Sequence, residues 1–117
     1  MLFCGYKYGF RLNALHDISG NKENKHAHTF YISLYIEAKN TDDFHPYYLV
    51  ENKIEKYLEK FNGKFLNEEP EFKDITPVYE NIGLVFYKEL AKVINDGHYI
   101  LQKLEINENP LATNIIK

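Results

Sequence analysis

A long alternation of apolar and other side chains over residues 26–38 constrains the fold more than any other feature of the sequence. One set of alternate positions is apolar and consists of Phe30, Ile32, Leu34, Ile36 and Ala38. The intervening set is polar or aromatic and consists of Thr29, Tyr31, Ser33, Tyr35 and Glu37. A period of two is typical of an antiparallel strand that covers a core with one face only. The pattern therefore predicts a half-buried strand over His26–Ala38.

Shorter patterns predict three more strands. Residues 2–10 alternate in the same way and predict a first strand, which is followed by a polar loop over residues 17–25. Residues 99–107 and 112–117 predict a final pair of strands, joined across Pro110.

Between these strands, apolar side chains at helical spacing predict two amphipathic helices. The stripe of the first helix consists of Val50, Ile54, Tyr57, Leu58 and Phe61, and that of the second of Ile82, Val85, Phe86, Leu90, Val93 and Ile94. Asn62-Gly63 ends the first helix and Pro77 begins the second. The order ββααββ predicts an α+β fold, with a four-stranded antiparallel sheet and both helices on one face.

Composition limits the class of protein. With 117 residues, we expect residues 1–117 to form one domain. A net charge of −3 argues against nucleic acid or anionic membrane as a partner, and no apolar run approaches the ~20 residues of a membrane span. The single cysteine, Cys4, suits a reducing compartment, so we expect a cytoplasmic protein. Because two helices leave the tyrosine-rich face of the sheet uncovered, we expect another subunit to cover it.

The histidines are the residues with the clearest chemistry. Side chains two apart on a strand point the same way, so His26 and His28 can hold one metal ion from one strand. His16 follows the first strand and could supply a third ligand, and three protein ligands are typical of a catalytic zinc site. On spacing alone the pattern is weak, because exposed strand histidines are common and Lys22 and Lys25 precede the pair.

Four short motifs occur in order along the chain: Phe10-Arg11-Leu12-Asn13-Ala14-Leu15-His16, His26-Ala27-His28-Thr29-Phe30, Leu66-Asn67 and Pro77-Val78-Tyr79-Glu80-Asn81. Together they resemble the pattern of the 6-pyruvoyl and 6-carboxy-tetrahydropterin synthases, which belong to the tunnelling-fold (T-fold) superfamily. The resemblance covers nearly the whole chain and has the same ββααββ order. It implies that His16, His26 and His28 bind Zn²⁺.

The resemblance also implies a substrate and an assembly. The expected reaction is that of a carbon–oxygen lyase on a dihydroneopterin triphosphate-type substrate, in a tetrahydropterin or queuosine-type pathway. Glu105 matches the place of the family's pterin-binding glutamate, and Glu80 lies in the motif at the start of the second helix, so we expect both to bind substrate. The family's assembly implies a hexamer of two trimers with sites between subunits.

The chain departs from the family at the residues that transfer protons. Lys22 stands at the position of the family's catalytic cysteine, and Asn62-Gly63 stand at the positions of its Asp-His pair. The motif positions Val78 and Ala27 replace a threonine and a glycine. The catalytic residue is therefore left open.

Four residues are candidates for that role. Glu23 lies one residue from the cysteine position, and His98 and His45 lie in turns from which they could reach a neighbouring subunit's site. Cys4 is expected, from its strand parity, to be a small core residue. Three hypotheses remain: a zinc-dependent lyase, a non-catalytic protein that binds zinc and a pterin or purine, and a structural subunit without metal.

Overall fold

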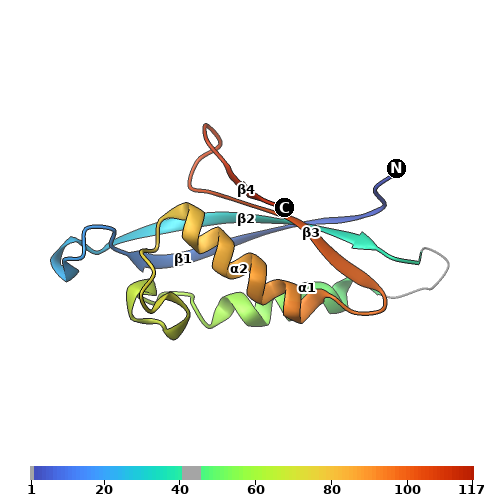
Figure 1. Ribbon diagram of the computed structural model, residues 1–117, viewed down its shortest axis with the longest axis horizontal. Helices are drawn as coiled ribbons and strands as arrows, with labels where there is room; N and C mark the ends of the chain where they lie inside the picture. The colour runs from blue at the N-terminus through green and yellow to red at the C-terminus, as the bar shows by residue number, and fades with distance from the viewer. Residues whose placement is uncertain (1, 41–45) are drawn as a thin grey trace.

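The computed structural model describes residues 2–40 and 46–117 and confirms the predicted order of elements. The strands are β1 (Gly5–His16), β2 (His26–Ala38), β3 (Tyr99–Asn107) and β4 (Asn114–Ile116), and the helices are α1 (Tyr47–Glu59) and α2 (Tyr79–Ile94). Three short 3-10 helices, η1 (Lys22–Asn24), η2 (Leu66–Glu68) and η3 (Pro70–Phe72), lie in the connections. The strands form one antiparallel sheet in the order β1-β2-β3-β4 (Figure 1).

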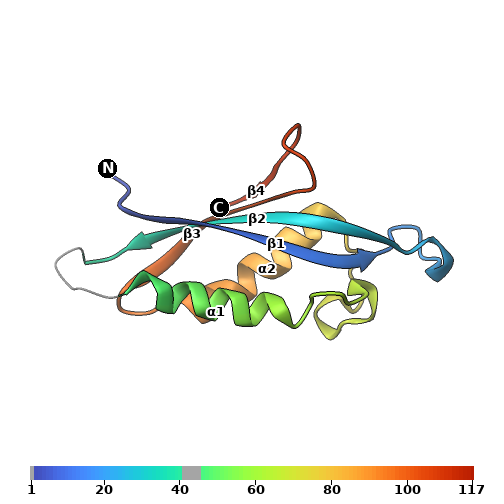
Figure 2. The same ribbon diagram turned by 180° about the vertical axis from the view of Figure 1, so that it is seen from behind.

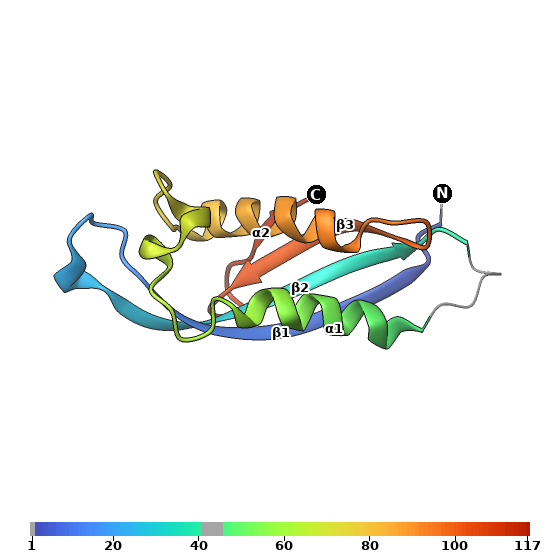
Figure 3. The same cartoon turned by 90° about the horizontal axis from the view of Figure 1, so that it is seen from below.

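Both helices lie on one face of the sheet, as predicted, with α1 beside β1 and α2 beside β3 (Figures 2 and 3). The core lies between these two layers. Its β2 members Phe30, Ile32, Leu34 and Ile36 are almost completely buried, and they pack with Val50, Ile54, Leu58, Ile82, Phe86, Leu90 and Ile94 from the helices. No helix of the described residues covers the opposite face, where Tyr31 keeps 43% of its surface exposed.

The first strand differs from its prediction. It begins at Gly5 and continues to His16, because its pairing with β2 runs without interruption from Gly5↔Glu37 to His16↔His26. His16 is therefore the last residue of β1 rather than part of the following loop, and it lies directly opposite His26. The expectation that Cys4 is a core residue is wrong, since Cys4 precedes the strand and is exposed.

Two element ends near the pocket described below also differ. The second helix begins at Tyr79 rather than Pro77, because Val78 is extended, with φ −78° and ψ 163°. The last strand covers only Asn114–Ile116, and it packs closely on α2 at Gly83, where an added Cβ would lie 2.4 Å from Ile116 Cδ1. Among the described residues, no helix has both the length and the apolar character that crossing a membrane requires.

Candidate metal centre and adjoining pocket

The three predicted metal ligands converge at one end of the β1–β2 hairpin. One ring nitrogen from each of His16, His26 and His28 lies within 4.8 Å of the other two. The ring centroids are 4.5 Å (His16–His26), 5.0 Å (His16–His28) and 4.6 Å (His26–His28) apart. Strand pairing produces this cluster, because His16 lies opposite His26 and His28 lies two residues further along the same face.

Each histidine has its Nδ1 atom engaged, which leaves Nε2 for a ligand. Nδ1 lies 2.8 Å from the Pro77 carbonyl oxygen in His16 and 3.1 Å from the Asn24 carbonyl oxygen in His26. A carbonyl can only accept, so both Nδ1 atoms donate. Nδ1 of His28 lies 2.5 Å from a carboxylate oxygen of Glu108 and donates to it in the same way. Such outer contacts to carbonyls and carboxylates are typical of metal-ligating histidines.

The Nε2 atom of His16 tests whether a metal fits this site. It is buried and has no hydrogen-bond partner among the described residues, and the whole residue is only 4% exposed. An unsatisfied buried polar atom costs about 1–3 kcal/mol, and a bound metal ion would satisfy it. Burial also lowers the pKa of His16, which favours the neutral imidazole that coordinates metals. A set of three neutral imidazoles suits Zn²⁺.

Glu108 belongs to this site but was missed by the sequence prediction. Its Oε2 atom accepts hydrogen bonds from His28 Nδ1 and from the Tyr79 hydroxyl, each at 2.5 Å. The hydrogen bond from Tyr79 holds the pKa of Glu108 below its usual value, so the side chain is an anion at neutral pH. The available signal was parity, because Glu108 continues the buried alternation of Leu104 and Ile106 one step past the end of β3.

The two glutamates predicted to bind substrate lie in different places. Glu105 accepts a hydrogen bond from the Tyr35 hydroxyl at 3.1 Å and lies 3.4 Å from the Lys103 ammonium group. Its neighbours Leu104 and Ile106 are buried beneath the helices, so Glu105 is on the opposite face of the sheet. The structure therefore does not bring Glu105 to the histidines of this chain. Glu80, in the first turn of α2, does line the pocket next to them.

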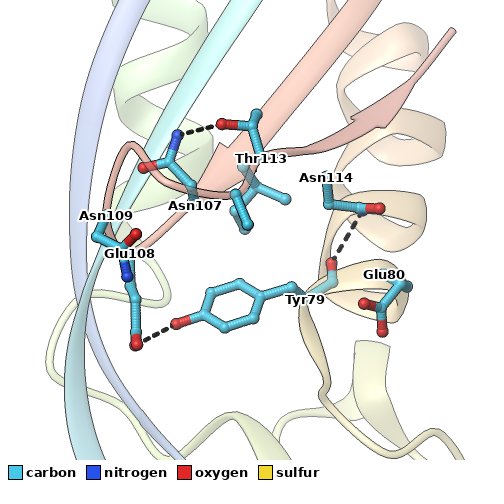
Figure 4. Close-up of a pocket in the computed structure, with 9 residues that line it drawn as sticks. Tyr79, Glu80, Asn107, Glu108, Asn109, Thr113 and Asn114 are labelled. Atoms are coloured by element: carbon cyan, nitrogen blue, oxygen red, sulfur yellow. Dashed lines mark hydrogen bonds between the residues drawn. The ribbon is translucent and has the colours of Figure 1, made fainter.

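That pocket has a volume of about 340 Å³ and opens beside Tyr79 and Glu108 (Figure 4). It is lined by Tyr79 and Glu80 from α2, by residues 106–109 at the end of β3, and by residues 112–114 leading into β4. Figure 4 shows the Tyr79 ring reaching across from the start of α2 to Glu108. The volume and the convergent carboxylate, amide and hydroxyl groups suit a small polar ligand.

The candidates for proton transfer are separated in the structure. Glu23 lies in η1, in the exposed loop that leads into His26, where the Asn21 side chain accepts a hydrogen bond from its backbone N–H. His98 lies beyond the far end of β2, where its carbonyl accepts from Lys39 N–H at 2.8 Å. The 13 residues of β2 span roughly 40 Å, so His98 cannot reach the histidines of its own chain. His45 lies outside the described residues.

Asn62 and Gly63 lie in a turn that follows α1. Gly63 has φ +74°, the left-handed conformation that favours glycine, and its N–H donates to the Asn13 carbonyl at 2.6 Å. Glycine adopts this conformation without the cost that a Cβ adds.

The fold and the three-histidine site define an α+β protein of the tunnelling fold with a candidate metal centre. Comparisons with known proteins identify its family: the sequence profile described as 6-pyruvoyl tetrahydropterin synthase matches residues 6–117. The chain belongs to the 6-pyruvoyl tetrahydropterin synthase family. No curated protein sequence matches the chain.

Solved structures agree with this fold. The 6-pyruvoyl tetrahydropterin synthase of Caenorhabditis elegans superposes with a TM-score of 0.81 at 17% identity, covering 100% of this chain and 96% of that one. A catalytic-residue mutant of the Plasmodium vivax synthase, with alanine in place of a glutamate, has a TM-score of 0.69 at 14% identity, covering 99% and 98%. An uncharacterized protein from Wolinella succinogenes has a TM-score of 0.74 at 11% identity, with the same coverage. At these identities the likeness establishes the fold alone.

Proposed function

We propose that this protein binds Zn²⁺ and acts on a dihydroneopterin triphosphate-type pterin as a carbon–oxygen lyase. The observation that carries the proposal is the convergence of His16, His26 and His28, with each Nδ1 engaged and the buried Nε2 of His16 lacking a partner. Membership of the synthase family supports the reaction class.

In this proposal the three Nε2 atoms hold the ion, and Pro77, Asn24 and Glu108 fix the ring orientations through Nδ1. Zinc held by neutral imidazoles would supply a Lewis acid that polarises a hydroxyl or carbonyl oxygen of the substrate side chain.

Substrate recognition is assigned to the pocket beside Tyr79. A carboxylate accepts hydrogen bonds from the amino and ring N–H groups at the edge of a pterin, and Glu108 and Glu80 both line this pocket. Because Glu105 faces the other side of the sheet, we assign the substrate-binding role expected of it to Glu108.

Proton transfer is assigned to Glu23. The similar Plasmodium vivax structure is of a mutant whose replaced glutamate is described as catalytic. Glu23 is an exposed glutamate in the loop that ends at the ligand His26, and a shift of that loop would bring it to the substrate. His98 from a neighbouring subunit is the alternative donor.

Turnover of dihydroneopterin triphosphate by zinc-loaded protein tests this function. We expect the Glu23→Gln variant to lose about 10²–10⁴-fold in rate, as is typical for a general acid–base group. Glu55→Gln, an exposed substitution on α1, is the control and should retain the wild-type rate. If the zinc-loaded wild-type protein shows no turnover above buffer, it is not a lyase for this substrate.

A second function, binding without catalysis, is favoured by Lys22 and Asn62-Gly63. The resemblance places the family's catalytic cysteine and Asp-His pair at these positions, and this chain lacks them. In that case the protein binds zinc and a pterin or purine without transforming it. The same experiment separates the two functions, because a ligand that raises the melting temperature without turnover indicates binding alone.

A further inference from the structure

Asn67 holds the backbone next to a metal ligand. Its Oδ1 atom accepts from the Asp17 N–H at 3.0 Å, and its Nδ2 atom donates to the Asp17 carbonyl at 2.8 Å. Asn67 lies in η2, 50 residues away in sequence, yet its amide pairs with both backbone polar groups of the residue that follows His16.

This contact extends a row of hydrogen bonds that residues 63–67 make along the outer edge of β1. Gly63 N–H donates to the Asn13 carbonyl at 2.6 Å, and Leu15 N–H donates to the Lys64 carbonyl at 2.8 Å. Leu15 also forms a parallel bridge with Phe65. At Leu66 the chain turns into η2 and its backbone stops pairing in this way. The Asn67 side chain then supplies, at Asp17, the hydrogen bonds that a longer strand would have made.

The side chain of Asp17, in contrast to its backbone, contacts the loop that follows β1. Its Oδ1 atom accepts from the Ser19 hydroxyl at 2.7 Å and from the Ser19 N–H at 3.1 Å, which orders the start of the loop after β1. Those contacts lie downstream of His16. Among the contacts described here, Asn67 is the one that ties the Asp17 backbone to a distant part of the fold.

We propose that Asn67 is a positioning residue for the metal centre, which fixes the backbone at Asp17 so that the His16 ring meets Pro77 and directs Nε2 toward His26 and His28. This inference rests on the proposed metal site. The need for such a residue follows from position, because His16 is the last residue of its strand and only the buried Asp17 separates it from a loop whose residues 18–25 are exposed. Strand ends open more readily than strand centres, and opening here would scatter the ligands. A ligand held in place before the metal arrives avoids that ordering cost when it binds.

The test is metal affinity, measured by competition of Zn²⁺ between a chelator and the metal-free protein. We expect Asn67→Ala to bind Zn²⁺ about 10- to 100-fold more weakly than the wild type, the range found for outer contacts of metal ligands. Asn67→Asp keeps an acceptor for the Asp17 N–H but loses the donor, so its affinity should be intermediate. The visible spectrum of the Co²⁺-loaded protein should change in Asn67→Ala, because the ligand geometry changes.

Asn95→Ala is the matched control. It also removes an amide-to-backbone hydrogen bond, from Leu101 N–H to Asn95 Oδ1 at 2.8 Å, but at the opposite end of the sheet. It should lower the melting temperature and leave the Zn²⁺ affinity and the Co²⁺ spectrum unchanged. Amide hydrogen exchange at Asp17 should accelerate in metal-free Asn67→Ala and not in Asn95→Ala.

Each other result overturns the inference in a recognisable way. Wild-type affinity in Asn67→Ala removes the positioning role and leaves the metal site intact. Equal losses of Zn²⁺ affinity in Asn67→Ala and Asn95→Ala would mean that the loss comes from lower overall stability and not from the position of His16. A wild-type protein that binds no Zn²⁺ removes the metal site itself and this inference with it.

Discussion

At the scale of single residues, Glu108 connects the metal centre with the pocket, because one of its oxygens accepts from both His28 and Tyr79. Replacing it by glutamine removes the negative charge that pairs with His28 and weakens both hydrogen bonds. We expect Glu108→Gln to lower the Zn²⁺ affinity by about 10-fold or more and to weaken pterin binding as well. Competition with a chelator and titration calorimetry with a pterin measure the two effects.

Glu105→Gln is the control. It makes the same substitution at a glutamate whose side chain lies on the other face of the sheet. It should leave both affinities at the wild-type value. If Glu105→Gln weakens pterin binding and Glu108→Gln does not, the substrate carboxylate is the one that the sequence predicted.

The residues of the site differ in how far the sequence could predict them. His26 and His28 follow from strand parity, His16 follows as a possible third ligand from its place after the first strand, and the resemblance implied all three. Parity pointed to Glu108 but was not sufficient, because residues 107–110 have the composition of a turn and β3 ends at Asn107. Which face its carboxylate occupies depends on its contacts with His28 and Tyr79, and these are tertiary contacts between distant segments.

At the scale of elements, hydrophobic periodicity predicted β2, β3 and the two helices, because each packs an apolar face against the same core. The ends of elements were less predictable. β1 reaches His16 through its pairing with β2, and Leu12 and Ala14 continue the buried alternation of Tyr8, a signal that the prediction of a strand over residues 2–10 did not use. The start of α2 at Tyr79 leaves Pro77 before the helix, where its carbonyl accepts from His16. Both differences concern the metal centre, since they set the position of one ligand and of its outer contact.

The packing of β4 on α2 gives a prediction at this scale. An added Cβ at Gly83 would lie 2.4 Å from Ile116 Cδ1 and 3.1 Å from Asn114 Nδ2. Gly83→Val adds two methyl groups beyond this Cβ and should therefore displace the Ile116 and Asn114 side chains and lower the free energy of unfolding by about 1 kcal/mol, at the low end of the usual cost of overpacking. Because Asn114 lines the pocket, pterin affinity should fall as well. Urea unfolding and calorimetry check the two effects.

Gly9→Val is the matched control for this prediction. No atom lies within 4 Å of a Cβ added at Gly9, and valine suits a strand. Its unfolding free energy should equal or slightly exceed that of the wild type. A Gly83→Val protein as stable as Gly9→Val would show that β4 does not depend on close contact with α2.

At the scale of the whole molecule, the shape indicates that the single chain is not the final unit. The molecule extends 53 × 27 × 21 Å, and its radius of gyration of 15.0 Å exceeds the roughly 13 Å expected for a compact domain of this length. Among the described residues, one face of the sheet has no helix over it (Figure 3), and β1 and β4 are the outer strands, with residues 63–65 lying along only the last part of β1. Open edges and an uncovered face favour association with further copies.

We therefore expect the protein to be a homo-oligomer in which sheets join edge to edge. Ile115 provides a test, since it is 51% exposed on the outer strand β4. A lysine on an edge strand opposes strand-to-strand pairing, so Ile115→Lys should shift the mass measured by light scattering toward that of one chain. Leu84→Lys is the control, because Leu84 is similarly exposed, at 43%, but lies on α2. A wild-type mass of one chain at micromolar concentration would contradict the assembly, and equal masses for the two variants would place the interface elsewhere than the β4 edge.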